Sequence, residues 1–243
     1  MSKKRLDQLV HEQYPHLSRT FIQSLVMQGK VTVDGRIITK PGVQVAPDAQ
    51  VVVDFQEPQY VSRGGFKLEK ALDHFTVDVR NLIALDAGLS TGGFTDCLLQ
   101  RGAAKVYGVD VGHGQVHEKI RNDARVVLLE NTNLRYSLTI PEQVDLVTLD
   151  LAFISVLKVM DTVVSVLKPT GHLVVLIKPQ FEARKEQVGK GGVITDPVVH
   201  QQVINTVIAG IEQRGFKCLG WIESPIEGAA GNKEFLSYFK RIP

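Results

Sequence analysis

The feature that most constrains the fold is residues 82–94, where an apolar run ends in an acidic residue and a glycine-rich turn follows. Residues 82–85 are apolar, Asp86 ends the run, and an amphipathic stretch begins at Phe94. This order predicts a strand, a tight loop and the start of a helix. Because glycine has no Cβ, the backbone of such a loop can approach a ligand closely.

A second strand-like run, residues 104–109, ends in Asp110. A carboxylate at the tip of the second strand is where α/β nucleotide sites hold a ribose. The glycine pattern differs from the G-x-G-x-x-G of dinucleotide sites, and the sequence has no Walker lysine loop. An adenosine-type ligand without a pyrophosphate therefore fits best, and S-adenosylmethionine is the leading candidate.

Strand and helix patterns alternate through most of the chain. The strand-like runs are residues 82–85, 104–109, 125–129, 144–149, 171–177, 216–222 and 234–239. Helical patterns lie between them, most clearly over 155–167 and 197–214. Residues 173–177 are apolar throughout, as expected for a strand that is buried on both faces of a parallel sheet. The pattern predicts a doubly wound, Rossmann-like α/β domain with a mostly parallel seven-stranded sheet.

The N-terminal part has a different pattern. Two helical stretches are expected at 4–12 and 18–28, the second with Ser18 as a good N-cap. The pair Asp34-Gly35 lies between alternating apolar runs and predicts a two-residue β-hairpin. A further strand-like run at 51–55 completes a small α+β module. We therefore expect a domain at 1–58, a linker at 59–64 and a larger domain at 65–243.

The charge distribution marks the N-terminal module as a candidate RNA-binding unit. The whole chain has a net charge of +2, yet residues 1–42 hold seven basic and three acidic side chains, a net charge of +4. A solvated charged face would have a similar composition, so the module's pattern also supports this interpretation. The candidate RNA-binding residues are Lys4, Arg5, Arg19, Lys30, Arg36 and Arg63.

Several classes of protein are disfavoured by the sequence. Cys97 and Cys218 lie in apolar segments and are interpreted as core thiols of a reducing compartment. His113 and His117 have helix-compatible spacing, but no third ligand is near them in the sequence, so they are interpreted as surface residues and no metal is expected. No apolar run reaches membrane-spanning length, and no h-region follows the N-terminus. A cytoplasmic protein is expected.

Charged residues end four of the predicted strands. Asp86, Asp110, Asp150 and Lys178 follow the runs at 82–85, 104–109, 144–149 and 171–177. Each one alone could simply cap its strand at the solvent edge. Ligands of open α/β sheets bind outside the carboxyl ends of the strands, so the four together favour a site.

Five motifs resemble those of the TlyA family. They are Ser-Arg-Gly-Gly-Phe-Lys-Leu (62–68), Asp-Ala-Gly-Leu-Ser-Thr-Gly-Gly-Phe-Thr-Asp (86–96), Asp-Leu-Ala-Phe-Ile-Ser (150–155), Lys-Pro-Gln-Phe-Glu (178–182) and Gly-Asn-Lys-Glu-Phe-Leu (231–236). Arg-Leu-Asp (5–7) and Gly-Lys-Val-x-Val-Asp-Gly (29–35) are similar to an S4-type RNA-binding module. The family carries the haemolysin name but resembles ribosomal RNA 2′-O-methyltransferases, with an S4-like module before an FtsJ-like domain. The resemblance implies a methyltransferase that modifies cytidine.

The resemblance also implies a catalytic set of Lys67, Asp150, Lys178 and Glu234. A ribose 2′-hydroxyl must lose its proton as it attacks the sulfonium methyl group. Lys178 is the expected base, provided that neighbouring Lys67 and partial burial favour its neutral amine. Asp150 is expected to orient Lys178, and Glu234 to hold one of the lysines or the ribose. Most of the rate acceleration would come from positioning.

Two of these assignments have competitors, and further segments border the predicted site. Lys70 lies one turn from Lys67, and Glu182 competes with Glu234. Residues 131–135 are either an adenine-contacting loop or an ordinary polar loop. Residues 189–197 have the composition of a mobile loop beside the site. The candidate cofactor-binding residues are Asp86, Gly88, Ser90, Thr91, Gly92, Gly93, Phe94, Asp110, Val111 and Asn131.

The expected partners are ribosomal RNA or ribosomal subunits rather than a membrane, and a monomer is favoured. A base methyltransferase is the nearest rival. However, an amino-group methyltransferase usually has Asn/Asp-Pro-Pro-aromatic where this chain has Asp150-Leu-Ala-Phe, and neither cysteine lies at a strand end for carbon-5 chemistry. A pore-forming haemolysin is disfavoured because no amphipathic membrane segment or export signal is evident. An RNA-binding protein with an inactive methyltransferase domain remains an open alternative.

Overall fold

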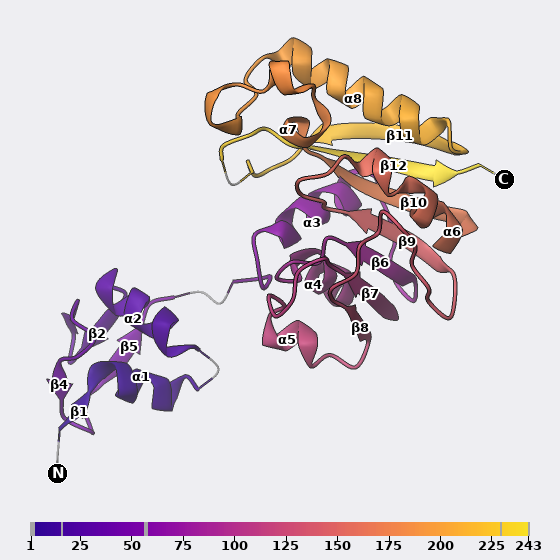
Figure 1. Ribbon diagram of the computed structural model, residues 1–243. Helices are drawn as coiled ribbons and strands as arrows, with labels where there is room; N and C mark the ends of the chain where they lie inside the picture. The colour runs from indigo at the N-terminus through magenta and orange to yellow at the C-terminus, as the bar shows by residue number, and fades with distance from the viewer. Residues whose placement is uncertain (1–2, 16, 56–57, 229, 243) are drawn as a thin grey trace. The chain divides into compact units, whose positions relative to one another are not determined.

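The computed structural model describes residues 3–15, 17–55, 58–228 and 230–242, and the chain divides into two compact units, residues 1–58 and 59–243 (Figure 1). The smaller unit packs two helices and short strands around its own core of buried aliphatic side chains. Its elements are β1 (Lys4–Arg5), α1 (Leu6–Gln13), α2 (Arg19–Met27), β2 (Val31–Val33), β3 (Arg36–Ile37), β4 (Gln44–Val45) and β5 (Val51–Val53). Strands β3, β2 and β5 form one antiparallel sheet, and β1 pairs with β4.

Two local signals in the smaller unit act as the sequence predicts. The Ser18 side chain accepts the main-chain N–H of Phe21 at 3.2 Å and caps α2. Asp34 and Gly35 both have positive φ, at +50° and +76°, between β2 and β3. Positive φ at both central residues is the geometry of a type I′ turn, which matches the twist of the paired strands.

The larger unit is an α/β domain built on a seven-stranded sheet. Its strands are β6 (Ile83–Ala87), β7 (Lys105–Val109), β8 (Val126–Leu129), β9 (Val144–Leu149), β10 (Leu167–Ile177), β11 (Phe216–Glu223) and β12 (Phe235–Arg241). The strand order is β11-β12-β10-β9-β6-β7-β8. The five strands from β10 to β8 are parallel, whereas β12 is antiparallel to both β10 and β11. The chain moves outward in opposite directions from β6 and β9, so the switch point of the sheet lies between these two strands.

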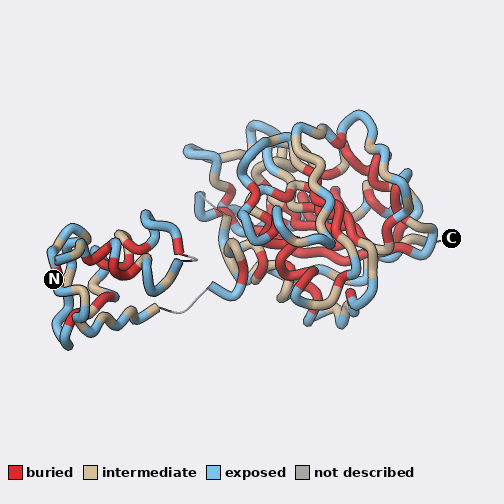
Figure 2. Tube along the Cα trace, turned by 90° about the horizontal axis from the view of Figure 1, so that it is seen from below, coloured by how far each residue is buried: buried red, intermediate tan, exposed pale blue. Residues whose placement is uncertain are grey.

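Helices cover both faces of this sheet, as Figure 1 shows. The helices are α3 (Gly64–His74), α4 (Gly93–Gln100), α5 (Glu118–Arg121), α6 (Met160–Val166), α7 (Pro179–Glu182) and α8 (Pro197–Glu212), with single 3₁₀ turns η1 (Val156–Lys158), η2 (Lys185–Gln187) and η3 (Lys190–Gly192). One apolar cluster joins one sheet face to α6 and α8, and a second joins the other face to α3, α4 and α5. The strands between them form the buried centre of the unit (Figure 2).

Two local predictions in the larger unit differ from the structure. Strand β6 continues to Ala87, so Asp86 lies within the strand rather than at its end. The helix expected at 155–167 is a 3₁₀ turn followed by α6, and Leu167 already belongs to β10. β-branched residues are frequent in this stretch and lower its helix propensity.

The segment expected as a linker packs on the larger unit. Tyr60 is buried, and its hydroxyl donates to the Glu69 carboxylate at 2.9 Å. The main-chain N–H of Val61 donates to the Asp96 carboxylate at 2.8 Å. Residues 60 and 61 are therefore fixed to the helices that follow them. None of the helices in the described ranges has both the length and the apolar character that crossing a membrane would require.

Candidate active site

The glycine-rich loop between β6 and α4 lies close to the end of β9. Gly88 has a φ of +90°, and a Cβ at this position would lie 2.3 Å from the main-chain oxygen of Asp150. Glycine alone accommodates both the left-handed conformation and this contact. The main-chain N–H groups of Gly88 and Leu89 donate to the Val109 carbonyl at 2.9 and 3.1 Å. The loop therefore brings together the ends of β6, β7 and β9.

Asp110, directly after β7, holds the same loop from the other side. Its carboxylate accepts the main-chain N–H groups of Ser90 and Gly112, both at 2.7 Å. A carboxylate can accept about four hydrogen bonds. Asp110 can therefore still accept hydrogen bonds from the hydroxyl groups of a ligand while it holds the loop.

A cavity of about 410 Å³ opens beside this loop and is the first of two at this edge of the sheet. Its volume lies in the range of small-molecule sites. The lining comes from four segments at the ends of the strands: Gly88 and Ser90; Val109–Gly112 with Gln115; Thr132–Leu134; and Asp150–Ile154 with Val159 and Lys178. The lining combines glycine backbone, the carboxylates of Asp110 and Asp150 and apolar side chains, which suits an adenosine-type ligand.

The four predicted catalytic residues form two ion pairs. Lys178 Nζ lies 2.6 Å from Asp150 Oδ1, and Lys67 Nζ lies 2.5 Å from Glu234 Oε2. All four side chains are largely buried, with exposed fractions of 3% for Glu234 and 21% for Asp150 at the extremes. Asp150 and Lys178 follow the parallel strands β9 and β10, Glu234 precedes β12, and Lys67 lies on α3. The pairing of Ile177 with Phe235 brings Lys178 and Glu234 to the same edge.

All four residues line the second cavity, which has a volume of about 510 Å³. This cavity also contains Ser62, Arg63, Gly64, Gly88–Thr91, Gly93, Phe94 and Ile226–Gly228 in its lining. Gly88, Ser90, Asp150 and Lys178 line both cavities, so the two spaces adjoin at the Lys178–Asp150 pair. This arrangement can hold two reactants, one in each cavity, with an amine and a carboxylate between them.

Asp86 does not face either cavity, contrary to its selection as a cofactor-binding residue. Its side chain is fully buried between β6, β9 and α4. The hydroxyls of Thr95 and Thr148 donate to its two carboxylate oxygens at 2.7 and 2.9 Å. Burial raises the pKa of Asp86 to about 6 in spite of these hydrogen bonds, and the nearby Asp150 charge adds to the rise. Asp86 on β6 therefore connects α4 to β9 through these two hydroxyls.

The other candidate cofactor residues are divided between the two cavities. Gly88, Ser90, Asp110 and Val111 line the first cavity, whereas Thr91, Gly93 and Phe94 line only the second. Gly92 packs against Ile120, and Asn131 is exposed outside both cavities, next to Thr132 and Asn133, which do line the first.

The sequence analysis missed part of the first cavity. Residues 151–154 line this cavity. They belong to the 150–155 motif and directly follow Asp150 at the end of β9, so their place in the sequence could have identified them. Gly112 and Gln115 lie in no motif that could have identified them.

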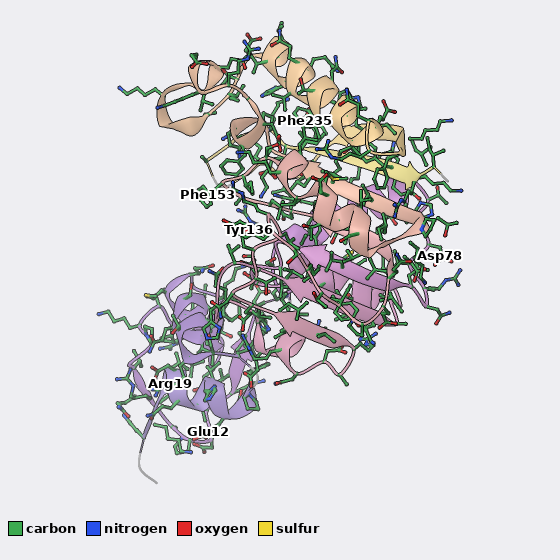
Figure 3. All side chains as sticks on the ribbon, turned by 45° about the vertical axis from the view of Figure 1, so that its right-hand side comes forward. Glu12, Arg19, Asp78, Tyr136, Phe153 and Phe235 are labelled. Carbon is green, nitrogen blue, oxygen red and sulfur yellow. The ribbon has the colours of Figure 1, made fainter. Side chains whose placement is uncertain are left out.

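Phe153 has a φ of +64°, and its ring centroid lies 5.2 Å from that of Phe181. Figure 3 shows Phe153 and Tyr136 at the surface of the larger unit, where both are strongly exposed.

The competing residues have other contacts. Lys70 is exposed on α3, and the Glu182 carboxylate accepts the main-chain N–H of Val156 at 2.7 Å, away from Lys67. His113 faces Glu130 at 3.3 Å, and the His117 side chain caps α5. Across the described ranges, no cluster of three or more His, Cys, Asp and Glu side chains is arranged to hold a metal ion.

In the smaller unit, several candidate RNA-binding residues are already in ion pairs. Arg5 donates two hydrogen bonds to Asp7, whose side chain is fully buried, and Arg19 lies 3.9 Å from the same carboxylate. Lys4 pairs with Glu12 and Lys30 with Asp54, whereas Arg36 is exposed on β3. Figure 3 shows Arg19 and Glu12 at the surface of this unit. Arg63 belongs to the larger unit and lines the second cavity.

Two family models match the chain. FtsJ-like methyltransferase matches residues 60–241, and the S4 domain matches residues 4–51. The protein named Hemolysin A of Brachyspira hyodysenteriae is 42% identical over 97% of this chain and 99% of its own length. The 16S/23S rRNA (cytidine-2′-O)-methyltransferase TlyA of Mycobacterium tuberculosis is 43% identical over 92% of this chain and 84% of its own length. A solved structure of a hemolysin-named protein from Streptococcus thermophilus matches with a TM-score of 0.74 and 38% identity, over 100% of this chain and 90% of that one.

Asp86 should make the stability of the larger unit depend on pH. Its pKa of about 6 in the folded protein lies above the ordinary 3.8, so its contribution to stability is complete below pH 4 and is lost as the pH rises to 6. We expect Asp86→Asn to gain stability relative to the wild type over this interval, by up to roughly 3 kcal/mol. Urea unfolding, followed by fluorescence of the single tryptophan Trp221, measures this difference.

Asp78→Asn is the matched control. The Arg80 guanidinium lowers the pKa of Asp78 to about 2, so this residue does not titrate between pH 4 and 6. Parallel stability curves for the wild type and Asp86→Asn over that interval would contradict the account of Asp86.

Proposed function

Because the chain belongs to the TlyA family of FtsJ-like methyltransferases, we propose that it transfers the methyl group of S-adenosylmethionine to a ribose 2′-hydroxyl of ribosomal RNA. The observation that carries this proposal is the Lys178–Asp150 pair on the wall shared by two adjoining cavities. A methyl donor in the first cavity and a ribose in the second would meet at this pair. The Mycobacterium tuberculosis relative is named a cytidine-2′-O-methyltransferase, and we expect the same specificity for cytidine here.

The first cavity fits the cofactor by the chemistry of its lining. Asp110 would accept hydrogen bonds from the two ribose hydroxyls of the adenosine. The loop backbone at Gly88 and Ser90 would lie beside the methionine part of the cofactor. Residues 132–134 and the apolar side chains near them would contact the adenine. When bound, the cofactor supplies an electrophilic methyl group and a neutral thioether leaving group.

The residues of the second cavity would act on the acceptor ribose. Lys178 Nζ takes the proton of the 2′-hydroxyl while the oxygen forms its bond to the methyl carbon, and the electron pair of the broken carbon–sulfur bond remains on sulfur. Asp150 fixes the position of Lys178 at 2.6 Å. Positioning of the attacking oxygen in line with the carbon–sulfur bond supplies much of the acceleration.

Lys178 shares the second cavity with a second lysine, and each of the two amines is paired with its own carboxylate. Lys67 lines this cavity, but Glu234 is paired with it. We infer that Glu234 holds Lys67 in position beside the ribose, as Asp150 holds Lys178.

The smaller unit would supply RNA affinity. It matches the S4 domain, and its basic side chains extend along β1, α2 and β3. Cationic side chains contact phosphates, which gives affinity that is independent of base sequence and sensitive to salt. Asp7 would hold Arg5 and Arg19 in place for these contacts.

The central experiment incubates ribosomal subunits with radiolabelled cofactor and maps the 2′-O-methylated positions. We expect transfer by the wild type, and a loss of about 10²- to 10⁴-fold in turnover for Lys178→Ala because the base is removed. Cofactor affinity should be nearly unchanged. Lys70→Ala, an exposed lysine on α3, is the control and should keep full turnover. Normal turnover in Lys178→Ala would refute the base assignment, and a wild type that binds RNA without transfer would favour the inactive alternative.

Asp110→Ala should weaken cofactor binding by at least about tenfold, because charge-assisted hydrogen bonds to the ribose are lost. Isothermal calorimetry with S-adenosylmethionine gives the dissociation constant. Asp78→Ala removes an exposed carboxylate at the opposite end of the strands, on the other side of the unit in Figure 3, and should leave binding unchanged. Equal dissociation constants for the wild type and Asp110→Ala would remove the ribose role.

Arg19→Gln combined with Arg36→Gln should weaken RNA binding and reduce its salt dependence. For single-stranded RNA, each lost phosphate contact should lower the slope of log affinity against log salt by about 0.7. Filter binding over a range of salt concentrations measures this slope. Arg80→Gln combined with Lys217→Gln removes the same charge from the larger unit and serves as the control. An unchanged slope in the first variant would contradict the docking role of the smaller unit.

A further inference from the structure

Asn232 is a buried amide between two segments that flank the site. It lies two residues before Glu234 and has an exposed fraction of only 2%. One segment is the loop from 183 to 196, which follows Lys178 and α7. The other comprises residues 224–228 and 230–234, between β11 and β12. Figure 1 shows the two segments side by side near α7.

The side chain of Asn232 joins the loop by two hydrogen bonds. Its Oδ1 accepts the main-chain N–H of Ile194 at 2.9 Å, and its Nδ2 donates to the Gly192 carbonyl at 2.9 Å. A carboxamide is suited to this role because it presents one acceptor and one donor side by side. The same pair of backbone groups cannot be satisfied by a carboxylate, which lacks a donor, or by an aliphatic side chain.

The main chain of Asn232 shapes the turn that faces the catalytic carboxylate. Its carbonyl accepts the N–H of Gly228 at 2.9 Å. A Cβ at Gly228 would lie 2.5 Å from Oε1 of Glu234, so the backbone of this turn rests directly on that carboxylate. Ile226, Glu227 and Gly228 line the second cavity.

The loop has few contacts of its own near its tip. Gly191 and Gly192 have φ values of +81° and +78°, and a Cβ at either position would meet open space. The N–H of Gly189 donates to the Val193 carbonyl, and a ring nitrogen of His200 lies 2.9 Å from the Ile194 carbonyl. Asn232 therefore ties the glycine-rich tip, through the Gly192 carbonyl, to the residues that precede Glu234.

We propose that Asn232 is a positioning residue that latches the 189–194 loop onto residues 226–228 and so fixes the wall of the cavity that receives the RNA. This inference rests on the proposed function for the identity of the acceptor. Asn232 acts through Gly228 and the loop, and it contacts neither the acceptor ribose nor the first cavity. It is therefore expected to influence the use of RNA and not the binding of the cofactor.

The test uses Asn232→Ala and Asn232→Ser in the full chain. Limited trypsin digestion at Lys190, followed by mass spectrometry, reports the opening of the loop without any RNA. Loss of both hydrogen bonds should raise cleavage at Lys190 by at least about tenfold in Asn232→Ala. Asn232→Ser can keep at most one of the two bonds and should give an intermediate rate. Asn205→Ala, an exposed asparagine on α8, is the matched control and should cleave like the wild type.

Kinetics on ribosomal subunits then separate positioning from a general loss of structure. Asn232→Ala should raise the KM for RNA by about tenfold, as expected when two buried hydrogen bonds no longer hold the wall, while the dissociation constant of S-adenosylmethionine stays unchanged. If Asn232→Ala does not fold, Asn232→Ser carries the same comparison.

Unchanged cleavage at Lys190 would overturn the latch, and faster cleavage with an unchanged KM for RNA would overturn the positioning role. A wild type that transfers no methyl group would instead overturn the proposed function and the KM claim with it. The cleavage measurement would then still decide the latch.

Discussion

The close contact between Gly88 and Asp150 is the constraint on which the rest of the site depends. With a Cβ at residue 88, the end of β9 would have to move away from the loop after β6, since the Asp150 carbonyl lies where that atom would be. The switch point of the sheet would then widen, and Lys178 would lose its shared position between the two cavities. Asp86 stabilises this arrangement. Its carboxylate accepts hydrogen bonds from Thr95 on α4 and Thr148 on β9 and so joins these two elements. The glycine-rich loop therefore packs directly on the end of the strand that precedes Asp150, and Asp86 links the helix after this loop to the same strand.

The two ion pairs, Lys67–Glu234 and Lys178–Asp150, keep four largely buried charged side chains next to an opposite charge. A buried charge without a partner costs several kcal/mol, and each lysine here has one carboxylate within hydrogen-bond distance. The pairs are not equivalent, however. Lys67–Glu234 is the more buried pair and joins α3 to the antiparallel strand β12, whereas Lys178–Asp150 joins two parallel strands on the wall shared by both cavities. This difference in burial and position is the reason why the proposed function gives proton transfer to Lys178 and a supporting role to the Lys67–Glu234 pair.

Antiparallel insertion of β12 between β10 and β11 is what brings the last part of the chain into the site. Five parallel strands alone would provide Asp110, Asp150 and Lys178 at their carboxyl ends. Because β12 runs in the opposite direction, the start of this strand meets the end of β10, and Glu234 arrives at the same edge. The turn held by Asn232 precedes that start and encloses the second cavity. The change in strand direction therefore adds the second cavity to a sheet edge that already carries the first.

The sequence by itself determined the α/β class, most strand positions to within a few residues, the hairpin at Asp34-Gly35 and the family. Uninterrupted apolar runs and turn residues are local signals, so they can be read without knowledge of distant contacts. The four catalytic candidates were found through motifs, but the pairing of Lys67 with Glu234 was left open, as Glu234 could have held either lysine. Asp86 was assigned to the cofactor because an acidic residue after four apolar residues marks a strand end, whereas β6 continues by hydrogen bonding to β7 and β9. The tertiary structure alone decided these points, because ion-pair partners, burial and the end of a strand are set by neighbours that are far away in the sequence.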